Sequence, residues 1–130
     1  MRADLRESLA GERQALRLAY LGKPEPQLLL RRHCALVDRT IREVWRETAL
    51  EGAALVATGG YGRGELYPGS DVDLLVLLPD GVTDAGKEKV EKLIGTLWDI
   101  GLEIGHSVRT IAECEAEMAA ASDARVTRRP

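Results

Sequence analysis

The sequence lacks the long apolar runs and cysteine patterns that define several classes of protein. Its 130 residues contain no apolar run of about 18 residues, so no segment predicts a membrane-spanning helix. No basic start followed by an apolar stretch predicts a secretory signal peptide. The two cysteines, Cys34 and Cys114, have no second cysteine or repeated histidine near them. We therefore interpret both as packing residues in a reducing cytoplasm rather than as metal ligands.

The chain also lacks an excess of positive charge. The 18 lysines and arginines are outnumbered by 21 aspartates and glutamates, which gives a formal net charge of −3. Binding of nucleic acid as a polyanion favours a basic stripe, so the composition argues against a nucleic-acid partner and suits a nucleotide or protein substrate better. The length and an apolar fraction of 45% predict one small domain with a single core.

Two acidic residues stand at the entrance of an apolar strand. Asp71 and Asp73 are two positions apart and precede the apolar run from Leu74 to Leu78. Because alternate side chains of a strand point to the same face, the two carboxylates should lie close together on one face of the strand. Without a cation they would repel each other, whereas Mg²⁺ takes one or two carboxylates and completes its shell with water and phosphate oxygens. The spacing therefore predicts a site for a metal-bound triphosphate.

A glycine-rich turn lies just ahead of these carboxylates. Gly59 and Gly60 end an apolar run, and residues without a side chain let backbone N–H groups come close to phosphate. We expect residues 61–66 to form a short helix whose positive end faces the anion, limited to a turn or two by two further glycines. Arg63 is a candidate partner for phosphate or for a nearby carboxylate.

Each of these features also has an ordinary interpretation. Gly-Gly and Pro-Gly pairs are common in turns, and Ser70 with Asp71 would suit the solvated start of a strand. Together these interpretations do not explain why two acidic residues precede a buried strand. The run from Leu74 to Leu78 predicts a strand buried on both faces, and acidic residues at its entrance cost free energy unless something coordinates them.

The order of elements predicts a mixed sheet backed by helices. Val90, Leu93, Ile94, Leu97 and Trp98 are expected to face inward from one helix, and five arginines of an earlier helix to face solvent. The expected helices cover residues 5–22, 26–48, 84–100 and 112–121, and the expected strands cover residues 53–58, 71–78 and 102–110.

Two stretches of the sequence carry a family resemblance. Gly59-Gly60, followed by Ser70-Asp71-Val72-Asp73, resembles the signature of the nucleotidyltransferase superfamily related to DNA polymerase β. The stretch from Leu97 to Thr110, which includes Gly-His-Ser-Val-Arg, is more specific. With the leading segments Leu28–Arg32 and Leu36–Asp38, it resembles the amino-terminal catalytic domain of the bacterial PII uridylyltransferase/uridylyl-removing enzymes, from about residue 5 to residue 124.

The resemblance implies a fold and a division of the chain. The fold class would be α/β (α+β), with a polymerase-β-like core in which a small mixed sheet has flanking helices. The implied parts are a helical amino-terminal extension (residues 1–50), an incomplete nucleotidyltransferase core (51–124) and a frayed tail (125–130). Family enzymes continue into an HD-type phosphohydrolase domain and ACT domains, so we expect this chain to be a fragment.

The resemblance also implies an activity, the transfer of UMP from UTP to a tyrosine of the PII nitrogen-regulatory protein with release of pyrophosphate. Asp71 and Asp73 would bind Mg²⁺, and the nucleotide-binding residues would be Gly59, Gly60, Arg63 and Ser70. No spacing in the sequence selects uracil. One alternative is a fragment that binds nucleotide or a partner without turnover. Another is a minimal nucleotidyltransferase with a different acceptor, such as an antibiotic or a toxin partner. The Gly-His-Ser-Val-Arg segment favours the PII-modifying family over such small enzymes.

The superfamily usually takes a third carboxylate from a neighbouring strand. Glu103 is the candidate, since it could share a face with Gly105 and Ser107, although a solvent-facing glutamate is an equally good interpretation. Asp99 is the second choice, at a helix end where a surface role is common. His106 could approach substrate, but a single histidine on a strand is more often structural.

Overall fold

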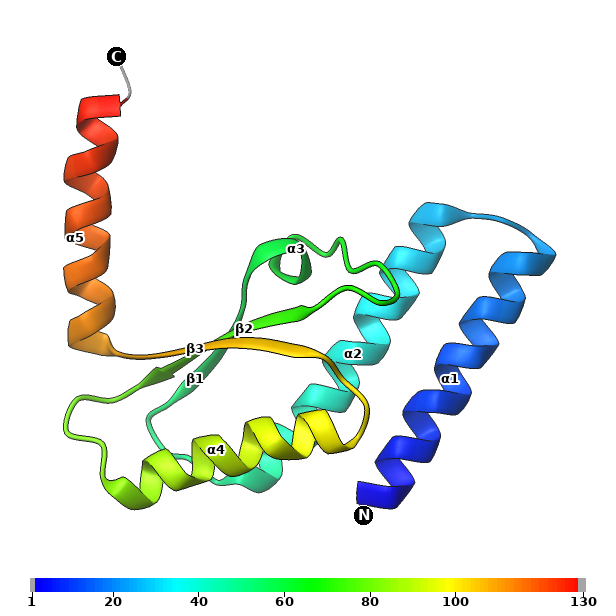
Figure 1. The fold of residues 1–130 in the computed structure, drawn as a ribbon, viewed down its shortest axis with the longest axis horizontal. Helices are drawn as coiled ribbons and strands as arrows, with labels where there is room; N and C mark the ends of the chain where they lie inside the picture. The colour runs from blue at the N-terminus through cyan, green and yellow to red at the C-terminus, as the bar shows by residue number, and fades with distance from the viewer. Residues whose placement is uncertain (1, 129–130) are drawn as a thin grey trace.

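The computed structural model describes the backbone of residues 2–128 and the side chains of residues 3–120 (Figure 1). Within that part of the chain, helices and strands follow the predicted order. Their bounds are α1 (Arg2–Gly22), α2 (Pro26–Thr48), β1 (Ala54–Ala57), α3 (Gly59–Gly62), β2 (Val72–Leu78), α4 (Asp84–Asp99), β3 (Ile104–Thr110) and α5 (Ile111–Arg128).

The sheet has the strand order β1-β2-β3 and is mixed, as predicted. The pair β1 and β2 is antiparallel, with Ala57 opposite Leu74. The pair β2 and β3 is parallel, with Val72 beside Ile104, and α4 forms the crossover between them. The architecture is thus α/β (α+β), consistent with a nucleotidyltransferase fold. In Figure 1, α1 and α2 run side by side at one end of the molecule, while α5 projects from the end of β3 at the other.

One face of β2 makes the core. Val72, Leu74, Val76 and Leu78 are each at most 3% exposed, and side chains of α1, α2 and α4 complete the same clusters. The other face of β2 is only partly buried, which corrects the prediction of a strand buried on both sides. Helices α2 and α4 supply the apolar cover on one side, so Leu74, Val76 and Leu78 pack inward while Leu75 and Leu77 face outward.

Helices α1 and α2 belong to the same core as the sheet. Leu9 of α1 and Val37 of α2 lie in one buried cluster with Leu74 of β2. The apolar stripe of α2 recurs at three and four positions, its five arginines are exposed as predicted, and Pro26 begins the helix at a position where its missing N–H costs nothing. The division at residue 50 therefore separates segments that share one hydrophobic cluster, and it stays a prediction.

Three local predictions were wrong. Trp98 was expected to face inward but is 51% exposed. The buried stripe of α4 packs on the core without it and consists of Val90, Leu93, Ile94 and Leu97. Strand β3 starts at Ile104, since the Leu102 N–H instead bonds the Leu97 carbonyl and closes the turn after α4. Helix α5 extends past residue 121, as its alanine- and glutamate-rich sequence favours. The predicted tail, residues 125–130, lies outside the described side chains.

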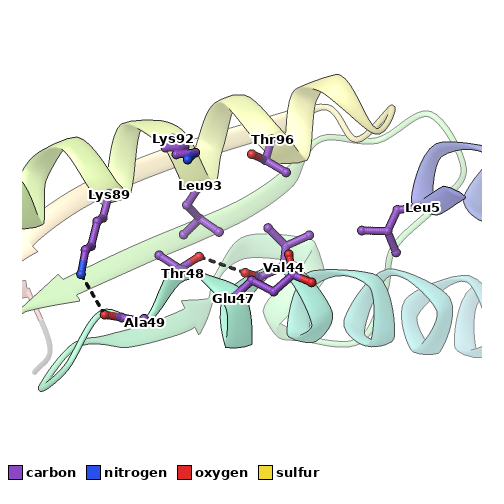
Figure 2. Close-up of a pocket in the computed structure, with 9 residues that line it drawn as sticks. All are labelled: Leu5, Val44, Glu47, Thr48, Ala49, Lys89, Lys92, Leu93 and Thr96. Atoms are coloured by element: carbon purple, nitrogen blue, oxygen red, sulfur yellow. Dashed lines mark hydrogen bonds between the residues drawn. The ribbon is translucent and has the colours of Figure 1, made fainter. Parts of the chain in front are cut away.

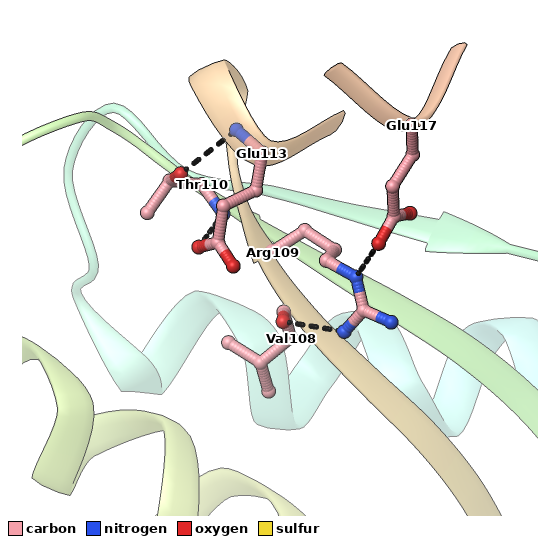
Figure 3. Close-up of polar contacts among 5 residues, drawn as sticks. All are labelled: Val108, Arg109, Thr110, Glu113 and Glu117. Carbon is pink, nitrogen blue, oxygen red and sulfur yellow. Dashed lines mark hydrogen bonds and ion pairs between the residues drawn. The ribbon is translucent and has the colours of Figure 1, made fainter. Parts of the chain in front are cut away.

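The junction between β3 and α5 is held by side chains (Figure 3). The Thr110 hydroxyl accepts a hydrogen bond from the Glu113 N–H at 3.2 Å, and Glu113 Oε1 accepts from the Thr110 N–H at 3.1 Å. This reciprocal pair is a capping box, which satisfies two backbone donors at the start of α5. Arg109 Nε donates to Glu117 Oε1 at 2.7 Å, so the arginine of the Gly-His-Ser-Val-Arg segment links β3 to α5.

Both cysteines are free and partly buried, and Cys34 packs against the main core as predicted. In the described part of the chain, no helix is both long and apolar enough to cross a membrane.

Candidate active site

The carboxylate of Asp73 lies on the outward face of β2. Its neighbours Val72 and Leu74 are buried on the inward face, so the strand period turns Asp73 the other way, where it is partly buried. Asp71 is the exposed residue just before the strand, and the same alternation puts it on the side of Asp73. The shared patch of the two carboxylates on one face of the strand stays a prediction.

Two glycines form a slot around the Asp73 carboxylate. A Cβ atom built on Gly59 would lie 2.6 Å from Asp73 Oδ2, and one built on Gly105 would lie 2.7 Å from Oδ1. Real Cβ atoms essentially never come that close, so any larger residue at either position would displace the carboxylate. Gly59 also has a φ of +58°, a left-handed conformation that glycine adopts readily. We name Gly59, Asp73 and Gly105 the carboxylate slot.

The slot is built by backbone pairing on both sides of β2. Gly105 stands beside Asp73 in the parallel register with β3. On the other side, the Thr58 N–H donates to the Asp73 carbonyl at 3.0 Å, and this bond brings the start of the glycine turn next to the strand. The contact of Gly105 with Asp73 was not predicted from the sequence, because it depends on a register between segments far apart in the chain. The glycine in Gly-His-Ser-Val-Arg was the available signal.

The glycine turn is a single helical turn, α3, which begins at Gly59 and not at Tyr61 as predicted. The Arg63 N–H closes the turn on the carbonyls of Gly59 and Gly60, at 3.2 Å each, and Gly64 then adopts a φ of +73° that ends it. A Cβ on Gly62 would lie 2.8 Å from the Ala57 carbonyl oxygen, so the turn packs directly on β1. The prediction erred because it did not anticipate the left-handed start at Gly59.

Arg63 and Ser70, the other predicted nucleotide-binding residues, are exposed. Arg63 Nε lies 3.7 Å from Glu65 Oε2, in a pair of side chains that are 67% and 61% exposed. Such exposed pairs contribute little to stability, so Arg63 can exchange this partner for another anion at small cost. The Ser70 N–H donates to the Tyr67 carbonyl at 3.0 Å, which closes the predicted Pro-Gly turn ahead of Asp71.

Glu103 is exposed just before β3, and its carbonyl accepts from the Val72 N–H at 2.7 Å. If the alternation of β3 extends one residue back, Glu103 has the same side as Gly105, as predicted from the sequence. Arg13 of α1 approaches this corner, since its Nη1 donates to the Gly101 carbonyl at 3.0 Å. Burial lowers the pKa of Arg13, and the negative charge of Glu103 opposes that shift.

The other two candidates lie elsewhere. Asp99 is at the end of α4, and its carbonyl oxygen accepts a hydrogen bond from Arg6 Nε at 2.7 Å. His106 stands beside Leu74 in the register, on the face opposite the Asp73 carboxylate. The structure therefore does not bring His106 together with the predicted carboxylates.

A metal would find hard oxygen donors here but no preformed cage. Among the residues that the structure describes, no group of three or more His, Cys, Asp or Glu could hold a metal ion. Magnesium sites at nucleotides usually use one or two carboxylates together with substrate phosphates, so a pair of carboxylates suffices for that chemistry. The slot keeps side chains away from both Asp73 oxygens, and the donor set fits a divalent cation bound with a triphosphate.

Two pockets in the described part of the chain are lined by residues other than the predicted site residues. The pocket in Figure 2, of about 590 Å³, lies between α2 and α4, where Lys89 Nζ donates to the Ala49 carbonyl at 3.2 Å. A second cavity, of about 560 Å³, opens between α1 and α2 and touches Pro68 and Gly69 of the loop ahead of Asp71. The candidate site is instead an open face of the sheet.

Comparison with known proteins agrees with the geometry. Residues 38–127 match the family model of the nucleotidyltransferase domain. A bifunctional uridylyltransferase/uridylyl-removing enzyme of Chromobacterium violaceum is 53% identical over 88% of this chain, and one of Aromatoleum aromaticum is 52% identical over 85%. The chain spans only 13% of the length of either relative. No solved structure matches it. The resemblance predicted from the sequence is confirmed.

Proposed function

This chain belongs to the nucleotidyltransferase domain family, and from that premise we propose that it transfers UMP from UTP to a tyrosine hydroxyl of the PII signal protein and releases pyrophosphate. Members of the family act on nucleotides. The choice of a uridylyl group rests on the relatives described as uridylyltransferases, and the choice of PII rests on the family resemblance of the sequence. UTP and PII are cytoplasmic, so the proposal places the reaction in the cytoplasm.

The observation that carries the proposal is the carboxylate slot. A strand residue that only needs a solvated surface position does not require glycine on both neighbouring segments. Here the turn after β1 and the strand β3 both lack a side chain where the Asp73 oxygens lie. This arrangement leaves room for the carboxylate between the two segments, where a cation with phosphate oxygens would meet it.

Nucleotidyltransferase domains generally depend on a divalent metal, and Asp71 and Asp73 would hold it. When bound, Mg²⁺ neutralises the triphosphate and polarises the acceptor hydroxyl. The chain's own groups orient the donor: Gly59 and Gly60 offer backbone to the β and γ phosphates, Arg63 supplies a positive charge, and Ser70 supplies a hydroxyl. Glu103 supplies a third carboxylate at the edge of the site.

The proposed chemistry is an in-line displacement. The acceptor oxygen forms a bond to the α-phosphorus while the bond from that phosphorus to the β-phosphate oxygen breaks. Pyrophosphate leaves with the electron pair, and the hydroxyl proton passes to a base. A fixed Asp73 and a fixed glycine turn contribute by holding the reacting atoms in line.

The test combines nucleotide binding with modification of PII. UTP, ATP, CTP and GTP are titrated with Mg²⁺, and PII is then analysed by mass spectrometry for added UMP. We expect selective UTP binding and a UMP adduct. Asp71→Asn and Asp73→Asn should reduce transfer by about 10³-fold, because a metal ligand supplies several kcal/mol. Glu91→Gln, an exposed carboxylate on α4, is the matched control. Unchanged transfer in both aspartate variants would exclude this site.

A second candidate, a domain that binds nucleotide without turnover, is favoured by one observation. The outward face of the sheet is only partly buried, and Asp71 and Glu103 are exposed, so the described residues leave the reacting atoms open to water. Selective UTP binding with no UMP adduct on PII would support this candidate. A UMP adduct formed by the 130-residue chain would exclude it.

A further inference from the structure

The glycine turn has a single side chain, and that side chain is anchored in the core. Gly59, Gly60 and Gly62 surround Tyr61, the one residue of α3 with a side chain. Tyr61 is 6% exposed and belongs to the main hydrophobic cluster. Its hydroxyl donates a short hydrogen bond to Asp38 Oδ1 on α2. The turn is therefore tied to the helical part of the chain at one point.

The tie suits a segment whose three glycines have no side chains to pack against the rest of the fold. Glycine loses more backbone freedom on ordering than any other residue, so a turn with three glycines in four positions is expensive to fix. Burial of the ring and a hydrogen bond to a charged acceptor offset that loss. A phenylalanine would fill the same space for the ring. The hydroxyl is the part that gives the partly buried Asp38 carboxylate a partner.

The Tyr61 hydroxyl keeps its proton. Burial raises the pKa of Tyr61 well above its usual range, and the hydrogen bond to Asp38 raises it further. The phenol therefore stays protonated and donates at any physiological pH. The contact is a fixed link and does not act as a pH switch.

Helix α2 holds the far end of the same loop as well. Leu66 is 1% exposed, and its carbonyl lies 3.2 Å from Nδ1 of His33, which is 2% exposed. Because a carbonyl only accepts, His33 must carry its proton on Nδ1. Between the two anchored residues, the segment from Gly62 to Glu65 is exposed and presents Arg63. Asp38 and His33 thus fix both ends of the loop from one helix.

We propose that Asp38 and Tyr61 are positioning residues that hold the glycine turn against Asp73, so that helix α2 sets the geometry of the carboxylate slot. The value of this link for nucleotide binding rests on the proposed function. The link itself concerns the conformation of the turn, and it is measurable without a nucleotide.

The first experiment observes the turn directly. In amide NMR spectra of the whole chain, Tyr61→Phe should shift the signals of Gly59, Gly60 and Gly62 and speed their hydrogen exchange, while Val76 in the core keeps its signal. Tyr67→Phe removes the same atom from a tyrosine that is 59% exposed in the same segment, and it should shift none of the three glycines.

A loss of stability alone must be separated from a loss of position. Val44→Ala truncates a buried residue on the same helix and lowers the melting temperature without touching the pair. It should leave the three glycine signals in place. Glycine signals that stay unchanged in Tyr61→Phe, or that move equally in Val44→Ala, would overturn the inference.

The second experiment measures binding of UTP with Mg²⁺ by calorimetry. Tyr61→Phe and Asp38→Leu should each weaken binding about tenfold, as expected for a hydrogen bond to a charged group, and the double variant should lose no more than either one. Asp38→Asn keeps an oxygen acceptor and should recover most of the affinity.

The two experiments separate the two proposals. If the wild-type chain binds no nucleotide with Mg²⁺, the proposed function fails, and the NMR result alone decides the positioning inference. If the wild type binds and both single variants bind equally well, the positioning inference fails while the proposed function stands.

Discussion

The two faces of β2 are built on different principles. On the inward face Val72, Leu74, Val76 and Leu78 are almost completely buried, and any apolar residue of similar volume would serve the fold there. On the outward face, Asp73 lies between two glycines whose missing side chains leave the space that its oxygens occupy. The inward face is specified by hydrophobicity, and the outward face by shape and charge. A substitution should therefore affect stability on one side and the site on the other.

Adjacent leucines on opposite faces of β2 give the largest expected contrast. Leu74→Ala should lower the free energy of unfolding by about 3 kcal/mol, because the cavity lies in the packed core. Leu75→Ala removes the same atoms from the partly buried face and should lower it by about 1 kcal/mol. Chemical denaturation measures both values. Equal losses would show that the outward face is covered, and the comparison between the faces would fail.

A methyl group added to the slot should affect binding more than folding. Gly105→Ala places a Cβ at 2.7 Å from Asp73 Oδ1, so the carboxylate must move, and binding of UTP with Mg²⁺ should weaken about tenfold, or 1.4 kcal/mol. Gly95→Ala on α4 is the matched control, because a Cβ there meets nothing within 4 Å. It should stabilise the helix by roughly 0.5–1 kcal/mol without weakening nucleotide binding. A Gly105→Ala variant that binds like the wild type would argue against the slot.

The free energy of unfolding should depend on pH through His33, a buried residue of α2. Burial lowers the pKa of His33 below its usual value of 6.5, so the folded chain resists a proton that the unfolded chain accepts. Stability from this group is fully present above pH 6.5 and is lost as the pH falls from there towards the lower pKa of the folded state. His33→Gln should flatten this part of the curve of unfolding free energy against pH, with His106→Gln as the control. A curve for His33→Gln parallel to the wild type would contradict the assignment.

The smallest effect is expected at the exposed start of α5. Hydrogen bonds from the backbone and side chain of Thr110 lower the pKa of Glu113, so the contribution of this carboxylate is present above its usual pKa of 4.5 and is lost as the pH falls below it. Glu113→Ala should slightly reduce helicity measured by circular dichroism at neutral pH, and the difference from the wild type should vanish in acid. Glu115→Ala, an exposed neighbour on the same helix, is the control. A difference that persists in acid would rule out the carboxylate as its source.

The sequence predicted those features that depend on local periodicity. Helix α2 was predicted at its observed bounds, because its apolar stripe is regular and Pro26 marks its start. The strand period also predicts that Asp71 and Asp73 share one side of β2, which stays a prediction. Their role as metal ligands stays a prediction, as do the roles of Glu103, Arg63 and Ser70.

Features that depend on register or on glycine conformation could not be predicted. His106 faces away from Asp73 because of its place beside Leu74, and Gly105 meets Asp73 for the same reason. Nothing in either segment alone sets that register. The start of α3 depends on the left-handed φ of Gly59, one of two φ signs that glycine adopts with similar ease.

The parallel pairing of β2 with β3 has a consequence for the order of folding. Asp73 meets Gly105 only after the intervening helix α4 has docked, whereas β1 and β2 are joined by a shorter loop. Closing the longer loop costs more chain entropy, so this contact should form late and open early. The carboxylate slot should thus be lost before the pairing of β1 with β2, and its loss would be the earliest sign of unfolding.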